Sequence, residues 1–146
     1  MGLVRDSGVS RLGRVILAED DDDLRHLFAR ELRAASLEVV EARSGAELLD
    51  RLALALAESP DFSSIDLVVS DIYMPGYNGV EVMTGLLAAE SWKPFVLMTA
   101  FASSALRKEA LDRGAVAVLE KPIAPALLRK VVVTTLSMPA RRSRVA

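Results

Sequence analysis

The sequence predicts an α/β fold in which five short strands alternate with five helices to form a doubly wound parallel sheet. Two observations lead to this prediction. Short apolar runs, typical of strands buried on both faces, alternate with longer segments whose apolar residues recur at helical spacing. This alternation continues along most of the 146 residues. Strands and helices that alternate in this way form parallel sheets with helices on both faces.

Three predicted strands and two predicted helices occupy the first half of the chain. The strands are the apolar runs at residues 15–18, 39–40 and 65–70. The first helix carries apolar residues from Leu24 to Leu32, and the acidic residues before it suit the positive end of a helix dipole. Ser44 and Glu47 have the spacing of a capping box, so we expect the second helix to begin there and to continue through Leu56.

The second half of the chain continues the alternation. Residues 74–79, which include a proline and two glycines, are expected to form a loop, and residues 80–90 a helix. Strands are predicted at residues 95–98 and 115–119, and helices at residues 103–112 and 124–136. In the last helix we expect Leu127, Leu128, Val131 and Val132 to face the core.

Composition restricts the class of protein. Apolar residues make up 51% of the chain and there is no cysteine, so we expect a globular domain without disulfides or thiolate metal sites. No apolar run approaches the ~18 residues of a membrane span, and the N-terminus lacks an apolar signal core. The chain is therefore predicted to be cytoplasmic and without membrane contact. The expected domain covers residues 14–138, between tails at residues 1–13 and 139–146.

Charge argues against a nucleic-acid partner. Of the formal net charge of −2, residues 1–14 contribute +2 and residues 139–146 contribute +3, which leaves −7 for residues 15–138. Affinity for nucleic acid comes largely from lysine and arginine against phosphates. We therefore expect no direct DNA binding, and we interpret the basic ends as solvated tails.

Polar side chains occur where the predicted strands end. Glu19 and Asp20 follow the first strand, and Asp71 follows the third. Thr99 ends the fourth strand, and Lys121 follows the fifth. Ligands of open parallel sheets collect at the carboxyl ends of the strands, so we expect these side chains to share one site.

The residue types indicate a metal-assisted reaction of phosphate. Two carboxylates ~4 Å apart repel each other by about 4 kcal/mol at an effective dielectric of 20, so such a cluster needs a proton or a cation. Oxygen ligands without nearby histidine or cysteine favour Mg²⁺. Magnesium, a hydroxyl and an ammonium can together neutralise a transferring phosphoryl group. Asp71 would be the nucleophile that forms an acyl phosphate.

Four segments resemble the response-regulator receiver domain of two-component signalling, of the type of the bacterial chemotaxis regulator. They are ILAEDDDD at residues 16–23, DLVVSDIYMPGYNGVEVM at 66–83, FVLMTAF at 95–101 and LEKPI at 119–123. The resemblance covers about residues 14–136. It implies a flavodoxin-like fold with strand order 2-1-3-4-5.

The resemblance also implies roles for the strand-end residues. Asp71 would be the phosphoacceptor and a magnesium ligand, Asp20 a direct ligand, and Glu19 a residue that acts mainly through water. The backbone carbonyl of Tyr73 would complete the protein ligands. Thr99 and Lys121 would each bind a phosphoryl oxygen. The peptide bond before the proline that follows this lysine is often cis in the family.

The partners implied by the resemblance are a sensor histidine kinase or a histidine phosphotransfer protein, which supplies the phosphoryl group, and a downstream protein. Phosphorylation would shift the population between two conformations that present different surfaces, built from residues 103–112 and 124–136. The chain would not be an enzyme beyond its own aspartyl phosphorylation and dephosphorylation. His26, the single histidine, is interpreted as an exposed helical residue.

Four positions depart from the family pattern or modify it. The family usually has an aromatic residue where this chain has Val118, so we expect altered coupling between phosphorylation and the output surface. Glu19 replaces the commoner aspartate and lengthens the reach of that carboxylate. Tyr73 and Phe101 would flank the phosphoryl site and shield it from water, which predicts a long-lived acyl phosphate.

Three alternatives remain open from the sequence. A magnesium-dependent phosphatase with an aspartyl phosphate would place its nucleophile after the first strand, within residues 19–22, and would leave the Met-Pro-Gly block unexplained. A degenerate receiver would act only as an unphosphorylated binding module. The chain is also consistent with a receiver cut from a larger regulator or hybrid kinase.

Overall fold

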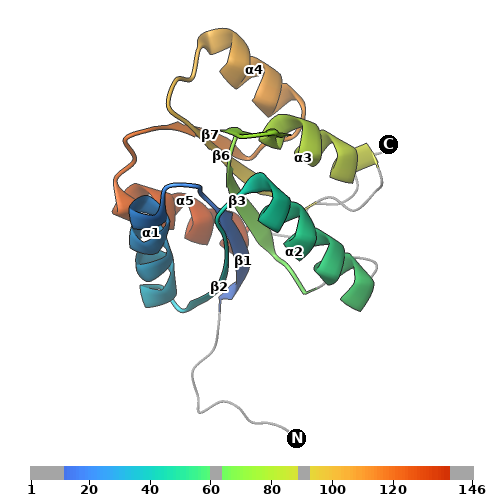
Figure 1. Cartoon of the computed structure of the whole chain (residues 1–146). Coiled ribbons are helices and arrows are strands. Elements are labelled where there is room, and N and C mark those ends of the chain that lie inside the picture. The colour runs from blue at the N-terminus through green and yellow to red at the C-terminus, as the bar shows by residue number, and fades with distance from the viewer. Residues whose placement is uncertain (1–11, 60–63, 89–92, 139–146) are drawn as a thin grey trace, which may run out of the picture.

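A central sheet with helices on both faces forms the core of the molecule (Figure 1). The computed structural model describes residues 12–59, 64–88 and 93–138. Both predicted tails lie almost wholly outside these residues. No helix in the described part of the chain is both long enough and apolar enough to cross a membrane.

The sheet has five parallel strands. They are β1 (Gly13–Ala18), β2 (Leu37–Ala42), β3 (Leu67–Asp71), β6 (Phe95–Thr99) and β7 (Ala117–Glu120). Their spatial order is β2-β1-β3-β6-β7, which is the expected order 2-1-3-4-5 for five sheet strands taken along the chain. The prediction of a flavodoxin-like sheet is therefore confirmed. The order reverses between β1 and β3, and a crevice is expected beyond the carboxyl ends of these strands.

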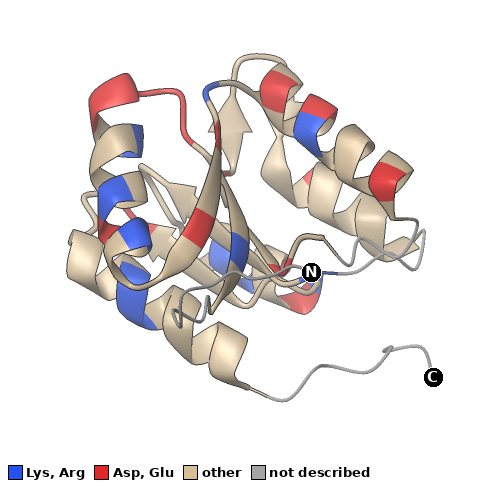
Figure 2. Cartoon of the chain, turned by 90° about the horizontal axis from the view of Figure 1, so that it is seen from below, with Lys and Arg blue, Asp and Glu red and all other residues tan. Residues whose placement is uncertain are grey.

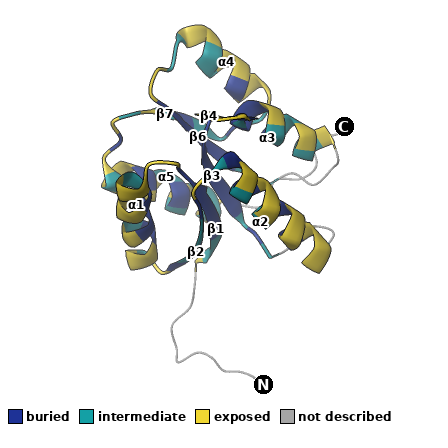
Figure 3. Ribbon diagram, viewed as in Figure 1, coloured by how far each residue is buried: buried dark blue, intermediate teal, exposed yellow. Residues whose placement is uncertain are grey.

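Five helices cover the two faces of the sheet. They are α1 (Asp22–Ala34), α2 (Gly45–Glu58), α3 (Gly79–Ala88), α4 (Ser104–Asp112) and α5 (Pro125–Ser137). One core cluster packs α1 and α5 against the sheet, and a second packs α2, α3 and α4 against the opposite face. The central strands β3 and β6 are buried throughout and the edge strands β2 and β7 only in part, whereas the helices expose their outer surfaces (Figure 3).

Side-chain caps fix where three of the helices begin. Asp21, Ser44 and Ser103 each accept a hydrogen bond from the backbone N–H three residues later, which satisfies a donor that the helix leaves free. The capping box expected at Ser44 is only half formed. The side chain of Glu47 accepts hydrogen bonds from the backbone N–H and the Nε of Arg43, both at 3.0 Å. In a complete capping box it would accept from the backbone N–H of Ser44, the next residue.

Two local predictions were wrong. Residues 73–78 form a small antiparallel hairpin of β4 (Tyr73–Met74) and β5 (Tyr77–Asn78), where we expected a simple loop. Leu127 is 46% exposed, although we expected it to face the core. Leu128 and Val132 are fully buried, four residues apart on one helical face, and Leu127 lies about 100° around the helix from Leu128.

Gly45 should be intolerant of a side chain. A Cβ at Gly45 would lie 2.4 Å from the Cβ of Tyr77, which belongs to the hairpin beside the site. We expect Gly45→Ala to lower the free energy of unfolding by about 1–3 kcal/mol, since packing must shift. Gly85 in α3 is the matched control: a Cβ there meets nothing within 4 Å, so Gly85→Ala should stabilise the helix by about 0.5–1 kcal/mol. Urea unfolding of both variants checks the pair, and equal effects would contradict the packing argument.

Candidate functional site

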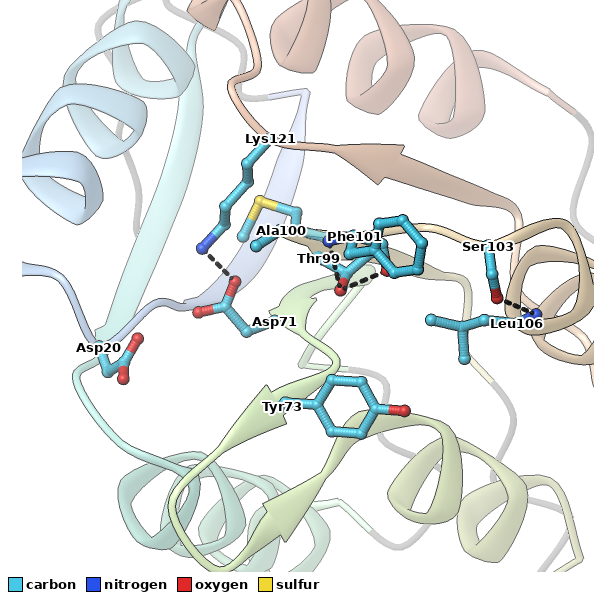
Figure 4. A pocket seen from close by; sticks show the side chains of 10 residues that line it. Asp20, Asp71, Tyr73, Thr99, Ala100, Phe101, Ser103, Leu106 and Lys121 are labelled. Atoms are coloured by element: carbon cyan, nitrogen blue, oxygen red, sulfur yellow. Dashed lines mark hydrogen bonds and ion pairs between the residues drawn. The ribbon is translucent and has the colours of Figure 1, made fainter.

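A pocket of about 410 Å³ lies at the carboxyl ends of the sheet strands. Its lining includes Asp20, Asp71, Tyr73, Thr99, Phe101 and Lys121 (Figure 4). The backbone register explains why segments far apart in the chain meet here. Ala18 is level with Ser70, Asp71 with Met98, and Thr99 with Glu120, so the strands end together at one edge.

Three carboxylates form an acidic cluster at this edge. Glu19, Asp20 and Asp71 each present one oxygen, and these oxygens lie within 4.8 Å of one another. Glu19 and Asp71 are buried, while Asp20 is exposed at the mouth of the site. The acidic stretch that leads into α1 is the red segment ahead of the helix with the blue bands in Figure 2. The predicted convergence of these three residues is confirmed.

Lys121 neutralises part of this cluster. Its Nζ lies 2.7 Å from Oδ1 of Asp71 and 2.7 Å from Oε1 of Glu19 (Figure 4 draws the contact with Asp71). The backbone holds the lysine in place, because the Lys121 N–H donates to the carbonyl of Thr99 at 2.8 Å. The Lys121–Pro122 peptide bond is cis, as the resemblance implied.

Burial has the largest effect on the ionisation of Asp71. It raises the pKa of Asp71 to about 7, with a further contribution from the negative charge of Glu19, although the hydrogen bond from Lys121 acts in the opposite direction. Burial lowers the pKa of Lys121, but its hydrogen bonds to Asp71 and Glu19 outweigh this and raise the pKa above the ordinary value. The ammonium therefore stays charged at neutral pH.

The donor set fits a hard divalent cation. Among the described residues, Oδ2 of Asp71 has no hydrogen-bond partner, and Oδ1 has the ion pair with Lys121. A buried carboxylate oxygen without a partner is costly, and a cation would satisfy it. All the available ligands are oxygens, the type that Mg²⁺ prefers. Glu19, Asp20 and Asp71 are the side chains that would hold it.

Thr99 and Tyr73 are near the site, but their polar groups are not fixed on Asp71. The hydroxyl of Thr99 faces the main chain of Phe101, 3.3 Å from its carbonyl and 3.4 Å from its N–H. The backbone of Tyr73 is held in the hairpin opposite Asn78. That its carbonyl ligates a metal stays a prediction.

Two exposed aromatic residues flank the pocket, as expected. Tyr73 is 59% exposed and Phe101 is 71% exposed, and both rings line the pocket that contains Asp71 (Figure 4). An aromatic ring that remains this exposed gives up much of the stabilisation that burial would bring. Both rings therefore stand beside Asp71 and remain open to solvent.

The structure adds residues that sequence reasoning missed. The Oγ of Ser70 donates to the carbonyl of Asp71 at 2.7 Å and lies 2.9 Å from the hydroxyl of Tyr77, which ties the end of β3 to the hairpin. Arg107 of α4 donates to the backbone carbonyl of Val118, the buried residue at the usual aromatic position. The contacts of Ser70 with Tyr77 and of Arg107 with Val118 join different elements, and no local pattern in the sequence signals them.

Arg25 was also missed, although the sequence carried a signal for it. It lies three residues before Phe28 and four before Ala29, both fully buried, on the inner face of α1. A charged residue at a core-facing helical position indicates a buried, paired side chain. His26, the next residue, has an exposed side chain as expected.

The chain was compared with known families and proteins. The family model for the response regulator receiver domain matches residues 15–133. The transcriptional regulatory protein PdtaR of Mycobacterium tuberculosis is 36% identical over 118 residues, which cover 80% of this chain and 52% of that protein. The two-component response regulator-like protein APRR7 of Arabidopsis thaliana is 34% identical over 75% of this chain and 15% of its own length. The chain thus spans about half, or less, of the length of these relatives.

Solved structures agree with the sequence comparison. The signal receiver domain of the response regulator NarL from Mycobacterium tuberculosis superposes with a TM-score of 0.74 at 26% identity, over 87% of this chain and 98% of that domain. The receiver domain of HemR from Leptospira biflexa, at 24% identity, shows the same fold with a TM-score of 0.76 over 89% of this chain and 98% of that one.

The sheet order and an acidic site are features that such domains share. Receiver domains act as phosphoacceptors in two-component systems and generally use Mg²⁺ at an acidic site. The match also favours this interpretation over an aspartyl-phosphate phosphatase with its nucleophile after the first strand. With residues 15–133 matched by the family model, the chain belongs to the response regulator receiver domain family.

Proposed function

We propose that Asp71 accepts a phosphoryl group from the phosphohistidine of a sensor kinase or phosphotransfer protein, in a reaction that needs Mg²⁺. A carboxylate oxygen of Asp71 forms a bond to phosphorus while the bond from phosphorus to the imidazole nitrogen breaks, and its electron pair leaves with the histidine. The observation that carries the proposal is a buried carboxylate at the end of β3 with a lysine 2.7 Å away and two further carboxylates beside it.

The remaining site residues assist by position and charge. Asp20 and Glu19 would hold the cation together with Asp71 and the backbone carbonyl of Tyr73, with Glu19 acting mainly through water. Bound Mg²⁺ supplies positive charge against the phosphoryl oxygens. Lys121 binds one of these oxygens, exchanging its contact with the Asp71 carboxylate for one with the acyl phosphate. The hydroxyl of Thr99 binds another after it turns away from Phe101.

The output of the reaction is a change of binding surface. In this proposal the surface includes α4 and α5, it recognises a downstream protein, and it does not contact DNA or a membrane. The chain works in the cytoplasm and turns over no substrate other than its own phosphoryl group. The contact of Arg107 with the carbonyl of Val118 links α4 to β7, where an aromatic side chain usually acts.

A small phosphodonor tests the proposed function directly. Incubation with acetyl phosphate and Mg²⁺ should add one phosphoryl group, seen by intact-mass analysis, and chelation of the metal should prevent the addition. Asp71→Asn should abolish it. Asp50→Asn, an exposed aspartate of α2, is the matched control and should be phosphorylated normally. A wild-type chain that stays unmodified would support the degenerate receiver instead, and modification of Asp71→Asn would place the acceptor elsewhere.

The exposed aromatic residues should prolong the life of the acyl phosphate. We expect Tyr73→Asn and Phe101→Ala each to accelerate dephosphorylation several-fold, because the smaller side chains admit water to the face of Asp71 from which it attacks. The decay of the phosphorylated protein, followed by mass after the donor is removed, measures this rate. Leu54→Ala removes an exposed apolar side chain on α2 and should change nothing. Unchanged rates in both aromatic variants would refute the shielding role.

A further inference from the structure

Arg25 is a buried arginine for which the proposed function has no use. It is 6% exposed, and its guanidinium has three attachments on three elements. Nη1 donates to the backbone carbonyl of Glu19 at 3.0 Å, Nε donates to Oε1 of Glu41 on β2 at 3.1 Å, and Nη2 lies 2.8 Å from Oδ1 of Asp22. A buried charge is tolerated when all its partners are in place, so these bonds explain how the arginine can be buried.

The bond to Glu19 matters most because of where that carbonyl lies. It belongs to the peptide that joins Glu19 to Asp20, two of the three acidic residues of the cluster. The rest of Glu19 is fixed as well: its N–H donates to Ala42, its Oε2 accepts from the N–H of Asp21 at 3.0 Å, and its Oε1 contacts Lys121. Arg25 supplies the remaining attachment, at the carbonyl of Glu19.

We propose that Arg25 is a positioning residue for the divalent-cation site: its guanidinium holds the peptide between Glu19 and Asp20 and thereby sets the spacing of their carboxylates. The inference rests on the proposed function, since it concerns the same site. A planar guanidinium with donors in fixed directions can hold the carbonyl while Glu41 and Asp22 keep the guanidinium from rotating. Groups that orient metal ligands in this way commonly affect metal affinity although they never touch the metal.

A purely electrostatic role for Arg25 predicts the opposite sign. A positive charge near the acidic cluster repels a divalent cation, so removing it would tighten cation binding. Removing a positioning group weakens binding, because the carboxylates lose their fixed spacing. A role confined to stability predicts a lower free energy of unfolding and no change in the affinity of the folded protein. The sign of the change in affinity therefore separates these three roles.

The experiment measures Mg²⁺ binding to the whole chain by titration calorimetry. We expect Arg25→Met to raise the Kd for Mg²⁺ about tenfold relative to the wild type. Arg33→Met is the matched control. Arg33 is on the same helix and its Nη1 binds the same Glu41, at 3.0 Å, but its Nη2 donates to Val39 and it makes no bond to Glu19. Its replacement should leave the Kd unchanged.

A second variant keeps the test decisive if Arg25→Met does not fold. Arg25→Lys retains the charge and the aliphatic stem of the side chain. Its single ammonium cannot replace the three guanidinium nitrogens that bind Glu19, Glu41 and Asp22, so the Kd of this variant for Mg²⁺ should also rise. A wild-type or tighter Kd in either folded variant would overturn the inference about Arg25. Absence of Mg²⁺ binding by the wild type itself would instead refute the metal site of the proposed function, and the positioning role with it.

Discussion

Replacing Lys121 with methionine should slow the phosphorylation of Asp71 by acetyl phosphate about 10²- to 10³-fold, while Mg²⁺ binds more tightly. The slowing follows because the ammonium lies 2.7 Å from Asp71, where the transferred phosphoryl oxygens must arrive with their negative charge. The tighter binding follows because the same ammonium lies 2.7 Å from Glu19 and repels a divalent cation held by these carboxylates.

Two measurements with one control test the role of Lys121. Intact-mass analysis at saturating Mg²⁺ gives the rate of phosphorylation, and calorimetry gives the Kd for Mg²⁺. Lys108→Met is the control, since Lys108 on α4 is exposed and forms an ion pair with Asp112 at 2.7 Å, away from the acidic cluster. Both values should be unchanged in the control. A slow Lys121→Met protein that also binds Mg²⁺ more weakly would show that the lysine supports the metal site instead of the phosphoryl group.

The convergence of the site residues could be predicted from the sequence because it needs little tertiary detail. Each of Glu19, Asp71, Thr99 and Lys121 is at or just beyond the end of an apolar strand, and the strands of a parallel sheet end at a common edge. Once the alternation of strands and helices is recognised, the exact register adds only the distances. The distances nevertheless decide the chemistry, as the 2.7 Å contacts of Lys121 show.

Most features that sequence reasoning missed depend on very short elements or on how a loop or helix packs in the folded chain. β4 and β5 have two residues each, too few to display an alternating pattern. The direction of the Thr99 hydroxyl depends on the loop at Phe101, and the bond from Arg107 to the Val118 carbonyl depends on how α4 packs on β7. The altered coupling expected from Val118 stays a prediction. Leu127 was wrongly predicted to face the core, because the sequence does not distinguish an apolar residue next to the buried face of a helix from one on that face.

Burial of the Asp71 carboxylate should make the metal-free protein less stable as pH rises. The pKa of Asp71 is about 7 in the folded protein, against 3.8 as its ordinary value, so the folded state binds the proton more tightly than the unfolded state. Stability from this group is therefore fully present below about pH 4 and is lost as pH rises through 7. Asp71→Asn cannot ionise. Its advantage in free energy of unfolding over the wild type should therefore grow by about 2–3 kcal/mol between pH 5 and pH 8.

Urea unfolding with a chelator present, at several pH values, measures this advantage. Asp50→Asn is the control, because it removes an exposed carboxylate of α2. Addition of Mg²⁺ at pH 8 should stabilise the wild type more than Asp71→Asn, since the cation binds the ionised folded protein and offsets the buried charge. If the difference in free energy of unfolding between Asp71→Asn and the wild type stayed constant from pH 5 to pH 8, the surroundings of Asp71 would not hold it in the protonated form. It would then be wrong that the metal-free protein accommodates the charge of Asp71 poorly, and this claim supports the cation site.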